Sequence, residues 1–224
     1  GRMVTSEAFV DVEASCQFAH AISTHKVDHE FDYYTAMDDL ERATDDDAGG
    51  GADMIGDIEF NSACYYKYFN VHIEGLMDNL TGKACRKNEV SEGDKQEARK
   101  IAAKAVSALV EAACRVTPSG KQNSFAAHQL PSLLWVEIRE NNLPVSYANA
   151  FSLPVNPKGK DGIEIESAKK LVEECEALTK IYSLEARKRL LLSKNKEIKF
   201  FEIESLEDLK SLLKTLEEAV MQGA

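Results

Sequence analysis

The alternation of apolar and polar positions along the chain predicts a mixture of helices and strands. An amphipathic helix is expected over residues 7–22, and residues 95–116 give the clearest helical pattern because alanine dominates them. A third helix is expected over residues 164–182, followed by a basic turn of helix at 187–189, and Ser205 is the predicted start of the last helix. In the alanine-rich segment, the face that we expect to be buried consists of Ile101, Ala105, Ala108, Leu109, Ala112 and Val116.

Strand patterns occupy segments between these helices. Residues 60–73 are rich in tyrosine and phenylalanine, residues 133–138 contain the tryptophan, and residues 197–203 form a short apolar run. Residues 27–60 interleave apolar and charged side chains around a run of glycines, which predicts a long exposed β-hairpin with its tip at 43–53. Because strands and helices are mixed without a regular βαβ period, the predicted class is α+β.

Charge is distributed unevenly along the chain. The formal net charge of −11 over 224 residues would normally argue against a nucleic-acid partner, because phosphate binding depends on Lys and Arg. The stretch from Asp28 to Glu59, however, holds twelve carboxylates and one base, so it alone carries −11, and the remainder holds 26 acids and 26 bases. The net charge therefore describes one acidic segment and not the whole protein.

Composition and cysteine usage indicate a globular protein from a reducing compartment. With 44% hydrophobic and 29% charged residues, the chain is neither collagenous nor largely disordered. The five cysteines are odd in number and widely spaced, which favours buried free thiols over disulfides or a zinc site. The sequence shows no signal peptide and no apolar run of ~20 residues, so we expect a cytoplasmic protein without a membrane partner.

Two groups of side chains resemble metal or hydrolytic sites. Asp38 and Asp39 could supply a Mg²⁺ ligand or a general base, although a solvated flexible loop is favoured because the acidic cluster adjoins the glycine run. His25 and His29 have the i, i+4 spacing that suits zinc on a helix, but the acidic run after them disfavours a helix there.

The PSGKQNSF turn is the third candidate, because it follows a predicted helix and could approach a phosphate. Gly120 permits close backbone approach, Lys121 can contact a phosphate, and Phe125 can pack or stack. The turn resembles a P-loop in composition only, and a simple helix-ending turn fits these residues equally well.

Three methionines also occupy unusual positions. Met3 follows Arg2, whereas Met37 and Met54 lie on opposite limbs of the acidic hairpin. Apolar side chains on an exposed arm need something to contact. Packing against the base of the arm is the simpler explanation, and wedging between nucleic-acid bases is the alternative.

At these residues the chain resembles a known family. The blocks GRM, AHAISTH, DYYTAMDDL, GDIEFNSACYYKYFNV, PSGKQNSFAAH and SYANAF follow one another in this order and span almost the whole chain. They closely resemble the CasC family, whose members are the crRNA-binding backbone subunits of Cascade, the type I-E CRISPR surveillance complex.

The resemblance implies a non-enzymatic RNA-binding subunit without a cofactor. A modified RRM-like palm would comprise residues 1–26 and 61–224, incomplete at its N-terminus, and residues 27–60 would form a thumb. Several copies would polymerise head to tail along the CRISPR RNA guide, bind other Cascade subunits, and displace guide nucleotides periodically so that the rest can pair with target DNA. The residues implicated are Met3, Met37 and Met54 as base-wedging contacts, with Lys121, Gln122, Asn123, Arg2 and His25 as further RNA contacts.

The chain departs from the family pattern at its beginning, and other hypotheses remain. Family members carry a long segment ahead of the GRM block, so we expect a fragment that binds RNA weakly alone and leaves a sheet edge unpaired. Related type III backbone subunits cleave RNA with a loop aspartate, and Asp38 or Asp39 would be the corresponding residue here. A soluble acidic interaction module is the third hypothesis. From the charge split we also infer that the acidic arm docks on basic residues of the next copy.

Overall fold

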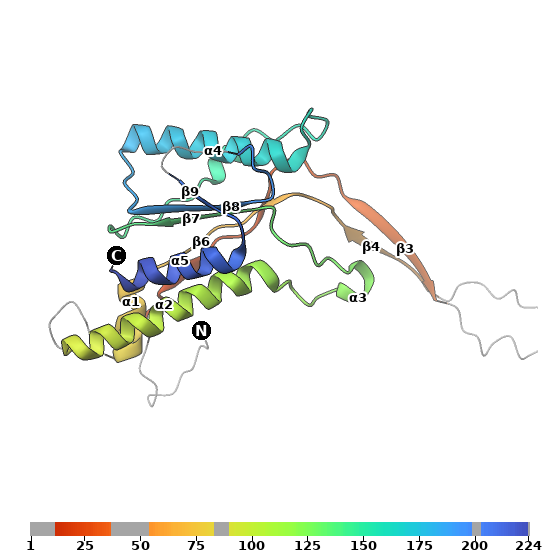
Figure 1. Ribbon diagram of the computed structural model, residues 1–224. Helices are drawn as coiled ribbons and strands as arrows, with labels where there is room; N and C mark the ends of the chain where they lie inside the picture. Colours follow the sequence, from red (N-terminus) through yellow and green to blue (C-terminus); the bar gives the residue numbers. More distant parts are fainter. Residues whose placement is uncertain (1–11, 37–53, 83–89, 199–202, 224) are drawn as a thin grey trace, which may run out of the picture.

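The computed structural model describes residues 12–36, 54–82, 90–198 and 203–223 of the chain (Figure 1). Its strands are β1 (Cys16–Phe18), β2 (Ile22–Ser23), β3 (Glu30–Ala36), β4 (Met54–Phe60), β5 (Tyr65–Tyr66), β6 (Phe69–Val71), β7 (Leu133–Ile138), β8 (Lys188–Ser193) and β9 (Glu204–Leu206). Its helices are α1 (Ile73–Thr81), α2 (Glu92–Arg115), α3 (Gln122–Phe125), the 3₁₀ helix η3 (Ala148–Phe151), α4 (Ile163–Tyr182) and α5 (Leu209–Met221). The predicted α+β class is confirmed.

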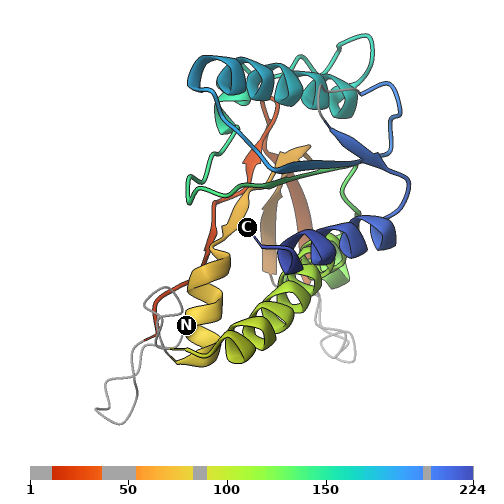
Figure 2. The same ribbon diagram turned by 60° about the vertical axis from the view of Figure 1, so that its left-hand side comes forward.

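The sheet β7–β8–β9 has helices on both of its faces. Strands β7 and β8 are antiparallel, and β9 joins β8 in parallel. Helix α4 covers one face, whereas α2 and α5 lie on the other (Figure 1; Figure 2). Successive residues of β8 therefore belong to different cores: Leu191 packs in the cluster that contains α4 residues, and Leu190 packs in the cluster with α2 and α5.

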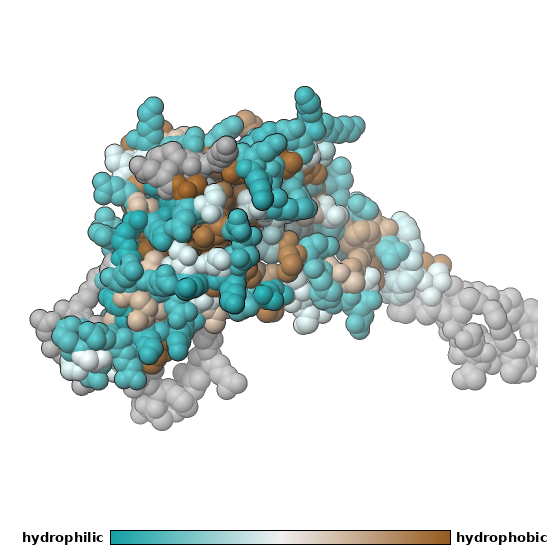
Figure 3. All heavy atoms as spheres, in the orientation of Figure 1, coloured by the Kyte–Doolittle hydropathy of each residue, from teal (hydrophilic) through white to brown (hydrophobic). Residues whose placement is uncertain are grey.

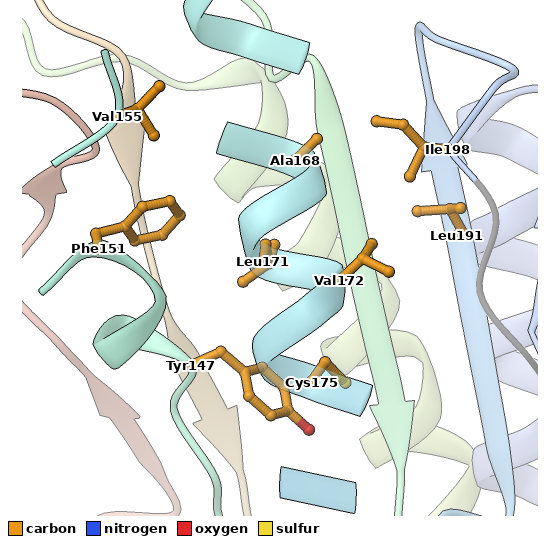
Figure 4. Packing of buried hydrophobic residues seen from close by; sticks show 9 residues of the cluster. All are labelled: Tyr147, Phe151, Val155, Ala168, Leu171, Val172, Cys175, Leu191 and Ile198. Carbon is orange, nitrogen blue, oxygen red and sulfur yellow. The ribbon is translucent and has the colours of Figure 1, made fainter. Parts of the chain in front are cut away.

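The core under α4 is closely packed. Figure 4 shows Leu171 and Val172 on one turn of α4 and Cys175 on the next, and Leu191 of β8 packs in the same cluster. Cys175 and Leu191 are 0% and 2% exposed. Full burial of such an aliphatic side chain contributes roughly 1.5–3 kcal/mol, so this layer anchors α4 firmly to the sheet.

A two-stranded arm extends from the body (Figure 1). Strands β3 and β4 pair antiparallel along their full length, from Glu30 opposite Phe60 to Ala36 opposite Met54. At the root of the arm, β2 pairs with β5, and β1 pairs with β6. The two limbs of the predicted hairpin are confirmed, and its predicted tip at 43–53 lies outside the described residues.

Helix α2 is confirmed, but it buries a different face from the expected one. The helix begins after Ser91, whose Oγ accepts the Asp94 N–H at 3.1 Å. Its buried residues are Ala98, Ala102, Ala103, Val106, Val110 and Cys114. Ile101 and Val116, both on the face expected to be buried, are instead 46% and 68% exposed. The prediction failed because this helix carries apolar side chains on more than one face.

The structure corrects several other expectations. Residues 12–22 are extended instead of helical because β1 and β2 pair with the aromatic segment. That segment, residues 60–73, holds two short strands, β5 and β6, in place of one long strand. The basic residues 187–189 lead into β8 and do not form a turn of helix. The last helix begins at Leu209 and not at Ser205, which belongs to β9.

The physical reason for the last correction is a cap nearer the helix. The Asp208 carboxylate accepts the Ser211 N–H at 2.8 Å, which satisfies a free amide of the first turn. The strand expected at 197–203 falls mainly on residues outside the described ones, and β9 follows it at Glu204–Leu206. Helix α1 was not anticipated from the sequence.

The described cysteines are free thiols, as expected: Cys114 and Cys175 are buried, and Cys16 and Cys64 are half-buried. Cys85 lies outside the described residues. None of the helices in the described ranges has the length and apolar character needed to cross a bilayer. In the same ranges, no three His, Cys, Asp or Glu side chains gather in a way that could hold a metal ion.

Candidate nucleic-acid interface

The two faces of the arm differ in how much apolar surface they expose. Phe31, Tyr33 and Ile55 lie on one face and are 52%, 74% and 71% exposed. On the other face Tyr34 lies over Gly56, where an added Cβ would come within 2.5 Å of the Tyr34 hydroxyl oxygen. We call the first of these the apolar face of the arm. Figure 3 shows apolar side chains at the surface where the arm leaves the body.

Both strands of the arm are acidic. They contain four carboxylates, Glu30, Asp32, Asp57 and Glu59, and no Lys or Arg. Glu59 Oε1 forms a hydrogen bond with His29 Nδ1 at the root of the arm. An RNA backbone would be repelled by this charge. RNA contacts therefore require either apolar side chains of the arm or basic residues outside its strands.

The PSGKQNSF turn lies at the base of the arm. The Phe125 ring packs against Phe60, the last residue of β4, with ring centroids 5.3 Å apart. Lys121 has φ 57°, in the left-handed region, and directly precedes α3. The contact between Phe125 and Phe60 thus holds Lys121 near the root of the acidic arm. The sequence indicated the chemistry of this turn, but not its position.

Lys121, Gln122 and Asn123 differ in their availability to a ligand. The Lys121 and Asn123 side chains are exposed. Gln122 is half-buried, and its Nε2 donates a hydrogen bond to the Pro118 carbonyl oxygen at 2.8 Å. Gln122 therefore stabilises the turn internally, whereas its two neighbours present their polar groups to solvent.

His25 lies inside the body. The residue is 9% exposed, its Nδ1 donates to the Lys26 carbonyl oxygen at 2.7 Å, and its Nε2 accepts the Cys64 N–H at 3.3 Å. These contacts require the tautomer protonated on Nδ1. Both ring nitrogens have protein partners, so His25 joins the two chain segments at the root of the arm.

Several predicted site residues lie outside the described part of the chain: Arg2, Met3, Met37, Asp38 and Asp39. Met54 is the first residue of β4 and is paired with Ala36, the last residue of β3. Met54 therefore lies at the end of the paired strands that is farthest from Glu30 and Phe60.

A buried ionic network that sequence reasoning missed lies beneath α4. Glu137 accepts hydrogen bonds from Arg189 Nε at 3.1 Å, from Arg139 Nη2 at 2.6 Å and from the Tyr147 hydroxyl at 2.8 Å. The Glu137, Arg189 and Arg139 side chains are only 9%, 4% and 10% exposed. The LLWVEI alternation was a usable signal, because it places Glu137 on the same sheet face as Trp135.

This network also connects the body to the root of the arm. The Tyr147 N–H donates to the Tyr66 hydroxyl at 3.0 Å, and Tyr66 belongs to β5. Burial raises the pKa of both tyrosines, so they remain neutral donors over the physiological range. Burial also raises the pKa of the adjacent Cys175 thiol, to about 11. The thiol therefore stays protonated at neutral pH and is a poor nucleophile.

These features define a class: an α+β body that carries an acidic β-arm and a lysine-bearing turn at its root. The family model of CT1975-like proteins matches residues 1–220. The chain therefore belongs to the CT1975-like protein family, and its resemblance to CasC is confirmed.

Solved structures agree with this assignment. A chain of a CRISPR RNA-guided surveillance complex is 28% identical, with a TM-score of 0.77 over 98% of this chain and 75% of that one. A chain of a pre-nicking CRISPR RNA-guided surveillance complex is 27% identical, with a TM-score of 0.78 over 98% of this chain and 54% of that one. The present chain thus spans about half of one matched chain and three quarters of the other. No curated protein matches it.

Proposed function

We propose that this chain is a non-enzymatic, crRNA-binding backbone subunit of a Cascade complex of type I-E. The proposal is supported by membership of the CT1975-like family and by similarity to surveillance-complex chains over 98% of the sequence. The subunit binds the CRISPR RNA guide in the cytoplasm, together with other copies of itself and other Cascade subunits. Residues 1–26 and 61–224 act as an RRM-like palm, and residues 27–60 act as the thumb.

The observation that carries the proposal is the contact between Phe125 and Phe60. It holds the turn that contains Lys121 against the root of an arm that has no basic residue in its strands. In this role the Lys121 ammonium contacts a phosphate and the exposed Asn123 amide adds a hydrogen bond. Such contacts do not depend on base identity, which suits a protein that must carry guides of any sequence.

The methionines contribute contacts of a different kind. Met54 lies at the far end of the arm strands, beyond the carboxylates that repel phosphate. In this role Met54, together with Met37 and Met3, wedges against a base and displaces one guide nucleotide, and Arg2 is a further RNA contact. The nucleotides between displaced positions remain free to pair with target DNA.

The test measures RNA affinity as a function of salt for Lys121→Gln. The matched control is Lys180→Gln, at another exposed lysine, on α4. If Lys121 neutralises one phosphate, Lys121→Gln weakens binding of a labelled guide-length RNA irrespective of sequence and makes the salt slope shallower by about 0.7. Lys180→Gln leaves both quantities unchanged. Equal affinities for the two variants would contradict the assignment of Lys121.

A second experiment separates RNA carriage from RNA cleavage. Co-expression with a CRISPR array is expected to yield a complex that contains RNA of one discrete length. Asp38 and Asp39 are the residues that a type III-like cleavage activity would use. Periodic Mg²⁺-dependent cuts in paired RNA that disappear in Asp39→Ala would favour the enzyme and refute the non-enzymatic assignment.

A further inference from the structure

The direction of the arm depends on how its root is attached to the body. Strands β3 and β4 pair with each other, and neither packs extensively on another described element. The arm leaves the body as a two-stranded ribbon (Figure 1). Because such a ribbon has little stability of its own in water, its orientation is determined by what holds its two ends. At the root, the chain enters the arm from β2 and returns from it into β5.

The strand that leads into the arm is fixed to α4 by a buried pair of hydroxyl groups. Thr24 directly follows β2 and is 2% exposed. Its Oγ1 accepts a hydrogen bond from the Ser167 hydroxyl of α4 at 2.8 Å, and its carbonyl oxygen accepts the Val155 N–H at 2.9 Å. Ser167 is buried as well, so the pair is shielded from solvent. Thr24 is therefore attached both to α4 and to the segment that precedes it.

The strand that returns from the arm is fixed by a different hydroxyl group. Tyr66 is the last residue of β5, and its hydroxyl oxygen accepts the Tyr147 N–H at 3.0 Å. The Tyr147 hydroxyl in turn donates to Glu137, which two buried arginines hold in place. The Tyr66 ring also packs on Phe151, with ring centroids 5.5 Å apart. This side of the root is thereby connected to the central sheet through Tyr147.

Both attachments end in the layer that contains α4. Tyr147, Phe151 and Val155 belong to the same core cluster as Leu171 and Cys175 of α4 (Figure 4). The two root strands, β2 and β5, also pair with each other. Two separate attachments to one packed layer fix the angle of a ribbon, whereas a single attachment would leave it free to pivot.

We propose that the hydroxyl groups of Thr24 and Tyr66 are positioning groups that set the angle of the arm relative to the body. A hydrogen bond has a preferred direction as well as a preferred length, so it determines orientation in a way that apolar contact does not. The Phe151 ring stabilises the contact with Tyr66, and the hydroxyl orients it. Only the consequence for RNA rests on the proposed function: the far end of the arm reaches a base of the guide if the arm keeps its angle.

The experiment removes one hydroxyl group at a time. Tyr66→Phe keeps the aromatic ring and removes the acceptor of the Tyr147 N–H. Thr24→Val keeps the shape of the side chain and removes the acceptor of the α4 hydroxyl. Each has a matched control. Tyr68→Phe removes the hydroxyl of a neighbouring half-buried tyrosine, which accepts a hydrogen bond from Asn70, and Thr24→Ser keeps the hydroxyl.

The angle of the arm is measured without RNA. Spin labels are introduced through a noncanonical amino acid, because the chain has five cysteines, at the exposed positions Tyr33 in the arm and Tyr182 at the end of α4. Tyr66→Phe and Thr24→Val are expected to broaden the distribution of distances between the labels, and the two controls are not. In Tyr66→Phe the Tyr147 amide exchanges its hydrogen about tenfold faster, as expected for the loss of one hydrogen bond.

A purely stabilising role of the two hydroxyls predicts a different result. Such a role would lower the free energy of unfolding in urea and leave the distance distribution as narrow as in wild type. A distribution that is equally narrow in Tyr66→Phe, Thr24→Val and their controls therefore overturns the proposal. Broadening in all four variants overturns it as well, because the loosening would then not depend on these two hydroxyls.

The consequence for RNA is measured with 2-aminopurine placed at successive positions of a guide-length RNA, since its fluorescence rises when a base is unstacked. Wild type and controls should give a periodic rise, which Tyr66→Phe and Thr24→Val lose while they keep the affinity that Lys121 supplies. Broadening of the arm distances without loss of the periodic signal would overturn the role of the arm angle in displacing bases. A wild type that binds no RNA, with the distance pattern intact, would count against the proposed function alone.

Discussion

The network around Glu137 allows the energetics of the fold to be tested by a single substitution. Glu137→Gln keeps the size of the side chain but removes its charge and replaces one acceptor oxygen with an NH₂ donor. The Arg189 and Arg139 side chains, which are 4% and 10% exposed, then lose the Glu137 carboxylate as an ion-pair partner. Removal of one partner from a buried ion pair costs roughly 3–5 kcal/mol, because the remaining charge is still removed from water but has lost the opposite charge that compensated for its desolvation.

That cost is large relative to the stability of a typical domain. Total free energies of unfolding are about 5–15 kcal/mol, so Glu137→Gln should remove a substantial fraction of the total. For a chain of this length each kcal/mol corresponds to about 2–4 °C, which predicts a melting temperature lower by roughly 6–20 °C. Urea unfolding followed by circular dichroism gives the free energy directly, and an unchanged m-value would show that the denatured state is unaffected.

The control is an exposed ion pair of the same chemistry. Glu111 lies 3.1 Å from Arg115 on α2, and the side chains are 46% and 63% exposed. Glu111→Gln should cost less than about 1 kcal/mol because solvent screens the pair. A double variant, Glu137→Gln with Arg189→Met, should be less destabilised than the sum of its parts, because one of the two buried charges that Glu137 neutralises has been removed as well. If Glu137→Gln were as mild as Glu111→Gln, the desolvation argument would be refuted.

Three further outcomes can be measured on the same protein. Leu190→Ala, at a side chain 0% exposed, should cost about 2–5 kcal/mol in urea unfolding, whereas Leu153→Ala, at one 75% exposed, should lie within about 0.5 kcal/mol of wild type. The pKa of the Cys175 thiol is raised from 9.0 to about 11, so the folded state holds this proton more tightly than the unfolded state does, and the free energy of unfolding falls as pH rises from about 9 to 11. Cys175→Ala should therefore lose less stability over this pH range than wild type, and an identical dependence of stability on pH would contradict the argument. The Asp208 pKa is lowered by its hydrogen bonds to Ser211, so the stability that this carboxylate contributes is present at neutral pH and is lost on acidification. The melting temperature of Asp208→Ala should therefore lie below that of wild type at neutral pH and approach it in acid, whereas that of Asp208→Asn should stay closer to wild type throughout.

Elements that depend on local pattern were predictable from the sequence. The alanine-rich segment became α2, the segment 164–182 became α4, and the run 133–138 became β7 with unchanged bounds. The arm was recognisable because its strands alternate apolar and charged residues around a glycine run. Each of these signals lies within a few turns of helix or one strand, where periodicity carries the information.

Elements that depend on distant partners were not predictable. The apolar spacing of residues 12–22 suits a helix, but β1 and β2 pair with β6 and β5 far along the chain, and that pairing determines their conformation. The same holds for the candidate site. The PSGKQNSF turn was identified by composition, yet only the contact between Phe125 and Phe60 brings it to the arm. His25 resembled a ligand in sequence, and its two hydrogen bonds inside the body could not be anticipated.

The wrong face predicted for α2 follows from the same limitation. Alanine fits a buried contact or an exposed turn almost equally well, so the position of the larger side chains has to decide which face is buried. Val106 and Val110 face the body, where they pack in the cluster that includes Leu212 of α5, while Ile101 and Val116 point to solvent. Because apolar residues lie on more than one face of α2, the sequence pattern alone did not determine which face is buried, and the packing of α5 and the sheet against Val106 and Val110 decides it.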